Sequence, residues 1–254
     1  MTSAGVRGRP QEHIGFLVWF SLLGLMFIGL AAVVLKFPFF YYRSIEISGE
    51  SHVSRADLLA DLRAYPLKNV FGRFLGFDHF FVWGSSSIAL PELVLSRVEV
   101  SRDFARRVLR VSVTDRERAL VWCGAENACA WVDPMGIAFQ YAPFADGQLI
   151  TSISEDGALP PLGAAVLPGN QFMRLQRVIE IVQGAGLMVE HIVFDRNLLE
   201  VTVTARNAPT LAFSLRFDSA FAATALSVLS GRKDFRNINV VDFRVEQKAY
   251  YKMK

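Results

Sequence analysis

The residue types that most often carry chemistry are isolated from one another in this sequence. Each of the four histidines lacks a second histidine or cysteine two to four residues away; they are His13, His52, His79 and His191. Cys123 and Cys129 are the only cysteines, and they have neither CxxC spacing nor a histidine close by. Because zinc and redox sites need such ligands at short, regular spacing, the sequence predicts no metal site.

Nucleotide-binding and acid–base motifs are also incomplete. Residues 230–233, of sequence SGRK, lack the upstream glycine and the terminal Lys-Ser/Thr order of a phosphate-binding loop. Asp115, Asp133 and Asp242 each lie in or beside an expected strand or turn, where ion pairing and capping are the ordinary roles. We therefore predict a protein that is not an enzyme, with no catalytic residue, no cofactor and no small-molecule substrate.

The charge of the chain is nearly balanced. Its 254 residues include 27 Lys or Arg and 24 Asp or Glu, which gives a formal net charge of +3. The part beyond residue 36 is closer still to neutral, and no long acidic or basic block interrupts it. Because a nucleic-acid surface requires clustered positive charge, we expect no nucleic acid among the partners.

An uncharged run from Ile14 to Leu35 sets the N-terminal part apart from the rest. As a helix it would be about 33 Å long, enough for the roughly 30 Å hydrocarbon core of a bilayer. Aromatic residues and Pro38 follow closely, as at a membrane interface. We expect a cytoplasmic tail at 1–13, a transmembrane helix at 14–36, and the lipid bilayer as the partner of that helix. A cleaved signal peptide is the alternative, but its apolar region is usually only about 7–15 residues long.

The orientation of such a helix depends on two further features. Basic residues are almost equally divided between its ends, since Arg7 and Arg9 precede it and Lys36 and Arg43 follow. The N-terminal tail is short, and the close cysteine pair suits an oxidising compartment. We therefore expect a single-pass protein of the cell inner (plasma) membrane, with a cytoplasmic N-terminus and a periplasmic C-terminal domain. Two unpaired thiols in a reducing compartment are the alternative for the cysteines.

Residues 43–115 predict a small α+β domain of order β-α-α-β-β. Three segments of alternating polarity indicate its strands: 44–48, 98–100 and 109–113. Ser54 begins a helix that Pro66 ends, and a second helix is expected near 88–95. The aromatic segment 71–83 lies between the two helices. It either packs on the domain's own core or contacts a membrane or a membrane partner.

Residues 116–254 predict a mostly antiparallel β domain with flanking helices, so that the whole fold is α+β. The expected helices begin at Asn170 and Ser219. The expected strands, in chain order, are 119–122, 130–132, 189–194, 198–204, 210–217, 238–244 and 248–251. The first two form a hairpin around Cys123 and Cys129, and we expect these cysteines to form a disulfide.

Several short motifs occur in an order that resembles one known family. They are Ile45-x-Ile47-x-Gly49, Val98-x-Val100-x-Arg102-x-Phe104, Leu109-x-Val111-x-Val113-x-Asp115-Arg116, Leu159-Pro160-x-Leu162 and Val241-Asp242-Phe243-Arg244. Together with the expected membrane helix, this order resembles the bacterial cell-division family FtsQ, called DivIB in Gram-positive bacteria. The resemblance covers nearly the whole chain. It implies a polypeptide-transport-associated (POTRA) domain at 43–115, followed by an FtsQ-type β domain at 116–254.

The resemblance also implies a function and a site. Members of the family are scaffolds of the division machinery (the divisome) at the septum, and their C-terminal edge accepts a strand from the small division protein FtsB. We therefore expect partners of the FtsB/FtsL type, bound partly by strand addition. The partner-binding residues that this implies are Val241, Asp242, Arg244, Val245, Glu246, Gln247, Tyr250 and Tyr251.

Two other functions remain as alternatives. A POTRA-bearing component of a protein transport or secretion assembly would carry a barrel or repeated POTRA modules, and this sequence shows neither. An exported enzyme acting on the cell wall would need a pocket with convergent polar groups and titratable residues with perturbed pKa values.

Overall fold

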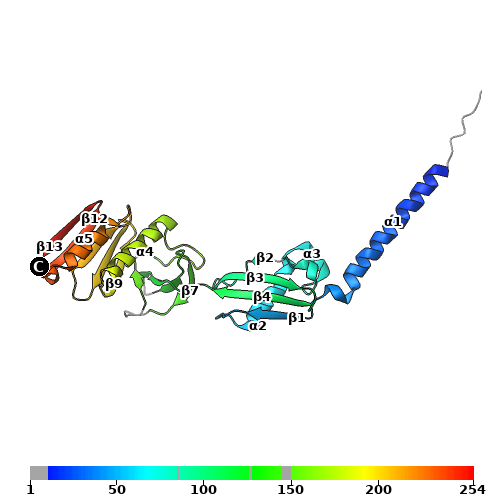
Figure 1. Cartoon of the computed structure of the whole chain (residues 1–254), viewed down its shortest axis with the longest axis horizontal. Helices are drawn as coiled ribbons and strands as arrows, with labels where there is room; N and C mark the ends of the chain where they lie inside the picture. The colour runs from blue at the N-terminus through cyan, green and yellow to red at the C-terminus, as the bar shows by residue number, and fades with distance from the viewer. Residues whose placement is uncertain (1–10, 85, 126–127, 145–149) are drawn as a thin grey trace, which may run out of the picture. The chain divides into compact units, whose positions relative to one another are not determined.

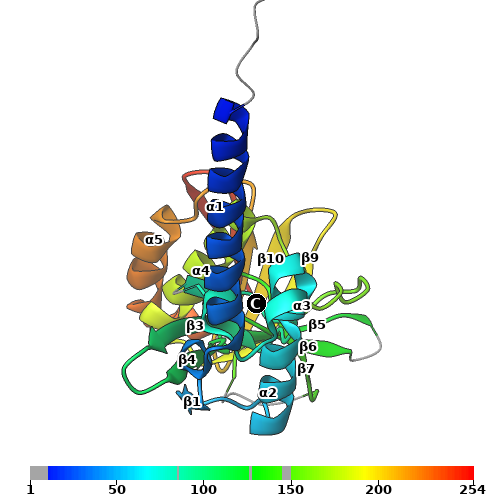
Figure 2. The same ribbon diagram turned by 90° about the vertical axis from the view of Figure 1, so that its right-hand side faces the viewer.

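The computed structural model describes residues 11–84, 86–125, 128–144 and 150–254. The chain divides into two compact units. Unit 1 takes in the residues up to Pro91 and Arg97–Thr114, and unit 2 takes in Glu92–Ser96 and Asp115–Lys254. The elements can be followed along the chain in Figure 1 and, after a 90° turn, in Figure 2.

The first element of unit 1 is helix α1 (Gln11–Lys36). Within the described ranges, no helix combines the length and the apolar character that crossing a bilayer requires. The transmembrane helix expected at 14–36 is therefore wrong, and so is the single-pass, inner-membrane location derived from it. That expectation rested on the absence of charge, which is a weaker condition than a sufficiently apolar helical length.

The sheet of unit 1 has the strand order β1-β4-β3-β2. Its strands are β1 (Ser44–Ser48), β2 (Ser86–Ile88), β3 (Leu95–Asp103) and β4 (Val108–Asp115). Strand β1 runs parallel to β4, which requires a crossover, and helix α2 (Arg55–Ala64) lies in that connection. The Ser54 hydroxyl caps α2 by accepting a hydrogen bond from the Asp57 N–H.

The second helix of unit 1 lies earlier in the chain than the sequence suggested. Helix α3 (Val70–Leu75) falls inside the aromatic segment, between the 3-10 turns η2 (Pro66–Lys68) and η3 (Phe80–Val82). The residues expected to form a helix near 88–95 instead end β2 and begin β3. Pro91 explains the difference, because the residue before a proline avoids the α region. The observed order is β-α-α-β-β-β.

In the described part of unit 2, nine strands form one sheet of order β13-β12-β11-β10-β9-β8-β5-β6-β7. The strands are β5 (Leu120–Cys123), β6 (Cys129–Val132), β7 (Ala138–Ala142), β8 (Ser152–Ser154), β9 (Val189–Asp195), β10 (Glu200–Ala205), β11 (Thr210–Ser214), β12 (Ile238–Val245) and β13 (Lys248–Met253).

This sheet is mixed, which corrects the expectation of a mostly antiparallel domain. Strand β8 is parallel to β5 and β9, and β11 is parallel to β12. Helix α4 (Gly169–Gly184) connects β8 to β9, and helix α5 (Phe221–Ser230) connects β11 to β12. Each helix is thus the crossover that a parallel pair needs. The sequence predicted both helices but not the parallel strand pairs that they connect.

Helices α4 and α5 share one hydrophobic core with the sheet. From α4 the core receives Phe172, Leu175, Val178 and Val182, and from α5 it receives Ala222, Leu226 and Leu229. The sheet contributes alternate residues such as Val201, Phe213 and Phe243, all fully buried. Residues at the intervening positions, including Glu200 and Asp242, belong to the other face of the sheet.

Candidate partner-binding edge

Strand β13 forms one border of the sheet of unit 2, and all six of its residues are exposed. It pairs with β12 on one side only. A border strand of this kind leaves half of its backbone N–H and C=O groups without a partner strand. Gln247 makes the turn from β12 with a positive φ of 59°, a conformation in which the chain reverses tightly.

The register of β13 identifies which backbone groups face outward. Tyr250 lies opposite Asp242 and Lys252 lies opposite Val240, while the Lys254 N–H donates to the Asn237 carbonyl oxygen at 2.9 Å. Because bonding direction alternates along a strand, residues 250 and 252 turn their backbone groups toward β12. The N–H and C=O groups that face away from the sheet are then those of Ala249, Tyr251 and Met253.

The eight residues implied by the family resemblance fall in three places. Tyr250 and Tyr251 lie on the border strand itself. Glu246 and Gln247 form the turn, and the remaining four lie one strand further in, on β12: Val241, Asp242, Arg244 and Val245. Val241 is fully buried in the core. The structure therefore places the free edge on β13, and the binding role of these residues stays a prediction.

On the helix side of the edge, Tyr251 is held by a basic residue. Tyr251 lies opposite Val241, so its ring belongs to the face that α4 and α5 cover. The Arg232 guanidinium lies over that ring at 5.4 Å from its centroid, a cation–π arrangement. Arg232 also forms an ion pair with Asp234 at 2.7 Å, and this hydrogen-bonded pair holds the pKa of the Asp234 carboxyl below its usual range.

On the opposite face, Arg244 is already engaged by two acids of this chain. Its Nε and Nη2 donate to the two Asp242 carboxylate oxygens at 2.9 and 2.7 Å, and its Nη1 donates to Glu200 Oε2 at 2.9 Å. The hydrogen bond from Arg244 lowers the pKa of Asp242. Lys248, Tyr250 and Lys252 share this face by alternation along β13. On this face Lys248 and Lys252 therefore add positive charge beside the edge.

Sequence reasoning missed Ala249 and Met253, whose backbones complete the free edge. It ended the last strand at Tyr251, whereas β13 extends to Met253. Residues 248–253 alternate between two sets, Lys248, Tyr250 and Lys252 on one side and Ala249, Tyr251 and Met253 on the other. This period of two could have predicted that the strand continues to Met253.

A buried polar network was also missed, beside the interior strands β5, β8 and β9 of the sheet. The Glu155 side chain is 1% exposed and accepts hydrogen bonds from Arg196 Nε and Nη2 at 2.8 and 2.7 Å. Trp122 Nε1 donates to the same carboxylate at 2.9 Å. Each oxygen of the buried carboxylate thus accepts at least one hydrogen bond, which compensates for its removal from water. These residues are far apart in sequence, and no local pattern joins them.

The cysteines lie beside this network. Cys123 on β5 and Cys129 on β6 face each other and form a disulfide, with their Cα atoms 4.0 Å apart. The Glu155 N–H donates to the Cys123 carbonyl oxygen at 2.9 Å. The disulfide therefore closes the β5–β6 hairpin next to the buried carboxylate.

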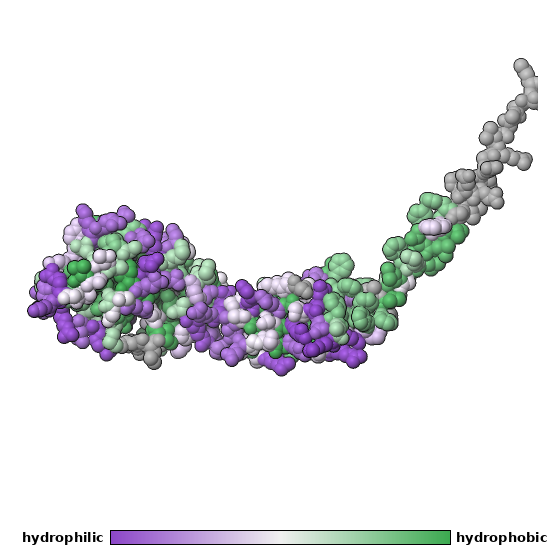
Figure 3. Space-filling view, in the orientation of Figure 1, coloured by the Kyte–Doolittle hydropathy of each residue, from purple (hydrophilic) through white to green (hydrophobic). Residues whose placement is uncertain are grey.

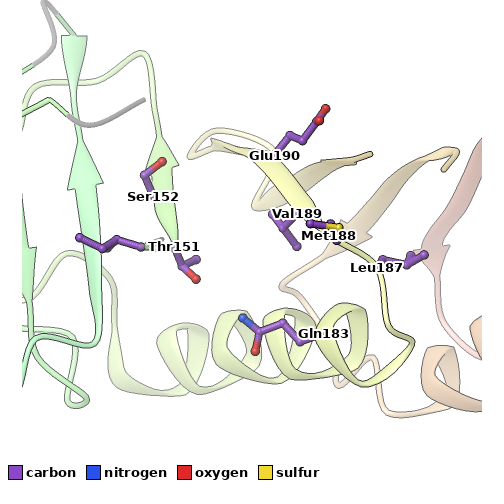
Figure 4. Close-up of a pocket in the computed structure, with 8 residues that line it drawn as sticks. Thr151, Ser152, Gln183, Leu187, Met188, Val189 and Glu190 are labelled. Atoms are coloured by element: carbon purple, nitrogen blue, oxygen red, sulfur yellow. The ribbon is translucent and has the colours of Figure 1, made fainter. Parts of the chain in front are cut away.

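A hollow of about 210 Å³ in unit 2 lies between α4 and the start of β9. Figure 4 shows Val189 of β9 directed toward helix α4, which carries Gln183, while Glu190 points away from the helix. Glu190 is paired with Arg206 at 3.0 Å. Among the described residues, no group of three or more His, Cys, Asp or Glu is placed to hold a metal ion. Among the described residues that line the hollow, no acid–base pair is brought together.

Comparison with models of known protein families finds no match for this chain, and comparison with curated proteins finds none either.

Proposed function

We propose that this protein is a non-enzymatic scaffold that binds another protein by strand addition at β13. The observation that carries the proposal is the border position of β13, with all six residues exposed and its outward backbone groups at Ala249, Tyr251 and Met253. An extended segment of a partner can satisfy these groups while side chains set its specificity.

The side chains of β13 define the chemistry of the segment it fits. Lys248 and Lys252 lie on β13, and lysines on a border strand discourage pairing with unselected chains. A partner strand with acidic residues opposite the lysines would overcome this repulsion. On the helix side, Tyr251 and Met253 offer exposed apolar surface to alternate residues of the same strand.

We further propose that the scaffold serves bacterial cell division, as the FtsQ/DivIB resemblance implies, with partners of the FtsB/FtsL type. The ordered motifs support this role, as does the border position of β13 at the C-terminal end of the larger sheet. In this proposal the protein holds its partners together and contributes no reaction of its own.

The test removes one backbone N–H group that faces away from the sheet and leaves the hydrogen bonds between β12 and β13 in place. Ala249→Pro deletes the Ala249 N–H, which faces away from β12, and adds bulk at the free edge. The soluble part of an FtsB-type protein from the same cell should bind this variant at least about tenfold more weakly, which corresponds to roughly 1.4 kcal/mol. The measurement is a calorimetric titration of the full chain.

The matched control is Ala249→Val, which retains the donor and should bind as wild type does. Thermal melts of both variants should remain close to wild type, because an exposed border residue contributes little to the core. Unchanged binding of Ala249→Pro would show that β13 is not the docking edge.

A further inference from the structure

Helix α3 exposes three large apolar side chains in unit 1. Val70, Phe71 and Phe74 are 72%, 76% and 72% exposed. Figure 3 shows hydrophobic surface over α3, among the hydrophilic residues of the same unit. Isolated apolar residues on a surface need no explanation, but a contiguous group of this kind marks an interaction site. We call Val70, Phe71 and Phe74 the α3 ridge.

The fold holds the ridge outward. A Cβ built on Gly72 would lie 1.9 Å from the Pro66 carbonyl oxygen, so this helix position touches η2 and admits only glycine. Residues one position apart on a helix are separated by about 100°. The ridge residues therefore lie on the side of α3 away from Gly72. The Asn69 side chain fixes the start of the helix by accepting a hydrogen bond from the Gly72 N–H at 2.6 Å.

The charges around the ridge are mainly positive. Arg73 lies within α3, and Lys68 lies in the turn before it. The Lys68 ammonium is held over the Tyr65 ring at 5.8 Å from its centroid. Between Arg63 and Val82 the sequence contains one acidic residue, Asp78. A partner for the ridge must consequently combine apolar anchors with acidic flanks.

We infer that the α3 ridge binds an amphipathic helix of a protein partner, with apolar residues on one stripe and acidic residues beside it. The three ridge side chains span about one helical turn, which matches the apolar stripe of a single helix. An anionic lipid surface is less suitable, because electrostatic binding to lipids uses clusters of about 4–8 basic residues. This surface lies in unit 1 and is independent of the β13 edge.

The experiment uses two labelled synthetic helices of about 18 residues, long enough to form a helix. Both carry leucine at positions i, i+3, i+4 and i+7 and alanine at most other positions; one has glutamate beside the leucine stripe and the other has lysine there. Anisotropy titrations with the full chain should show that the acidic helix binds more tightly than the basic helix. Phe71→Ser/Phe74→Ser should weaken binding of the acidic helix by about 10–100-fold, because it removes both aromatic anchors.

Two further variants make the test decisive. Arg73→Glu should weaken the acidic helix and strengthen the basic one, since it reverses the flanking charge. Met173→Ser/Val228→Ser removes two equally exposed apolar residues from α4 and α5 and should leave binding unchanged. Equal binding of the acidic helix to wild type and to Phe71→Ser/Phe74→Ser would overturn the inference. The inference would also be overturned if Phe71→Ser/Phe74→Ser weakened binding to vesicles of anionic lipid and left binding of the acidic helix unchanged.

Discussion

The guanidinium of Arg196 and the carboxylate of Glu155 form a two-point ion pair in which one partner is buried and the other reaches solvent. Glu155 is 1% exposed and Arg196 is 46% exposed, and the hydrogen bonds that Arg196 donates to the Glu155 carboxylate raise the pKa of the Arg196 guanidinium. Arg196 Nη2 also donates to the Val166 carbonyl oxygen at 3.1 Å. The pair therefore ties the β9–β10 turn to β8 and to the chain segment before α4.

Removing Arg196 should destabilise unit 2 more than removing Glu155. Arg196→Ala leaves the buried Glu155 carboxylate with Trp122 as its remaining side-chain donor, and we expect a loss of about 3 kcal/mol. Glu155→Gln retains an acceptor for Trp122 and should cost about 1–2 kcal/mol. Urea unfolding of both variants measures the difference. Equal free energies of unfolding would mean that water already solvates the carboxylate.

Reduction of the Cys123–Cys129 disulfide should lower the stability of unit 2 modestly. The closed loop is short, because the two cysteines are 6 residues apart, so the expected loss is about 2 kcal/mol. Thermal melts with and without a reductant provide the measurement, and Cys123→Ala/Cys129→Ala serves as a control that should not respond to the reductant. Labelling of the unreduced, unfolded protein should detect no free thiol; two labelled cysteines would contradict the bond.

The ion pair of Asp242 and Arg244 should contribute stability that depends on pH. Because Arg244 lowers the pKa of Asp242, this contribution is present above the ordinary aspartate pKa and is lost as the pH falls through the lower, folded-state value. Arg244→Gln should therefore cost about 1 kcal/mol near pH 7 and less near pH 2, where Asp242 is protonated to a greater extent. Denaturant titrations of both proteins at the two pH values test this, and a difference that grows in acid would refute it.

Gly72→Ala should destabilise unit 1. The added methyl group cannot be accommodated beside the Pro66 carbonyl oxygen, so α3 must move away from η2 at a cost of about 1–3 kcal/mol. Gly84→Ala is the matched control, because its nearest atom is the Ser86 hydroxyl oxygen at 3.4 Å, an ordinary contact. Thermal melts followed by tryptophan fluorescence distinguish them, and an unchanged Gly72→Ala melt would show that the helix has room.

Much of the local structure could be predicted because it depends on neighbouring residues. Alternating polarity identified β1 and the central parts of β3 and β4, and Ser54 identified the start of α2. Helix α3 escaped prediction because its six residues are too few for a helical period, and its exposed aromatics obscure the little that exists. Strand β2 escaped prediction because its three residues are too few to show an alternating pattern.

The candidate site could be predicted only in part, because its position depends on topology. The sequence identified a last strand pair and both of its tyrosines. It could not show that the crossover through α5 brings β12 alongside β11 and leaves β13 outside. Val245, one of the residues that the family resemblance implies, pairs with Lys248 at the hairpin end. The free donor to remove is instead that of Ala249.

From β8 to β13, the order of the strands across the sheet is the same as their order along the chain. During synthesis on a ribosome, each new strand can therefore dock on the edge that the preceding strand has just formed. Until β12 and β13 emerge, the outermost strand is β11, whose Leu211 and Phe213 are fully buried in the finished protein. Nascent chains that stall after β11 should expose an apolar, aggregation-prone edge and need chaperone protection. Once β13 has formed, its lysines make the border of the finished sheet resistant to aggregation.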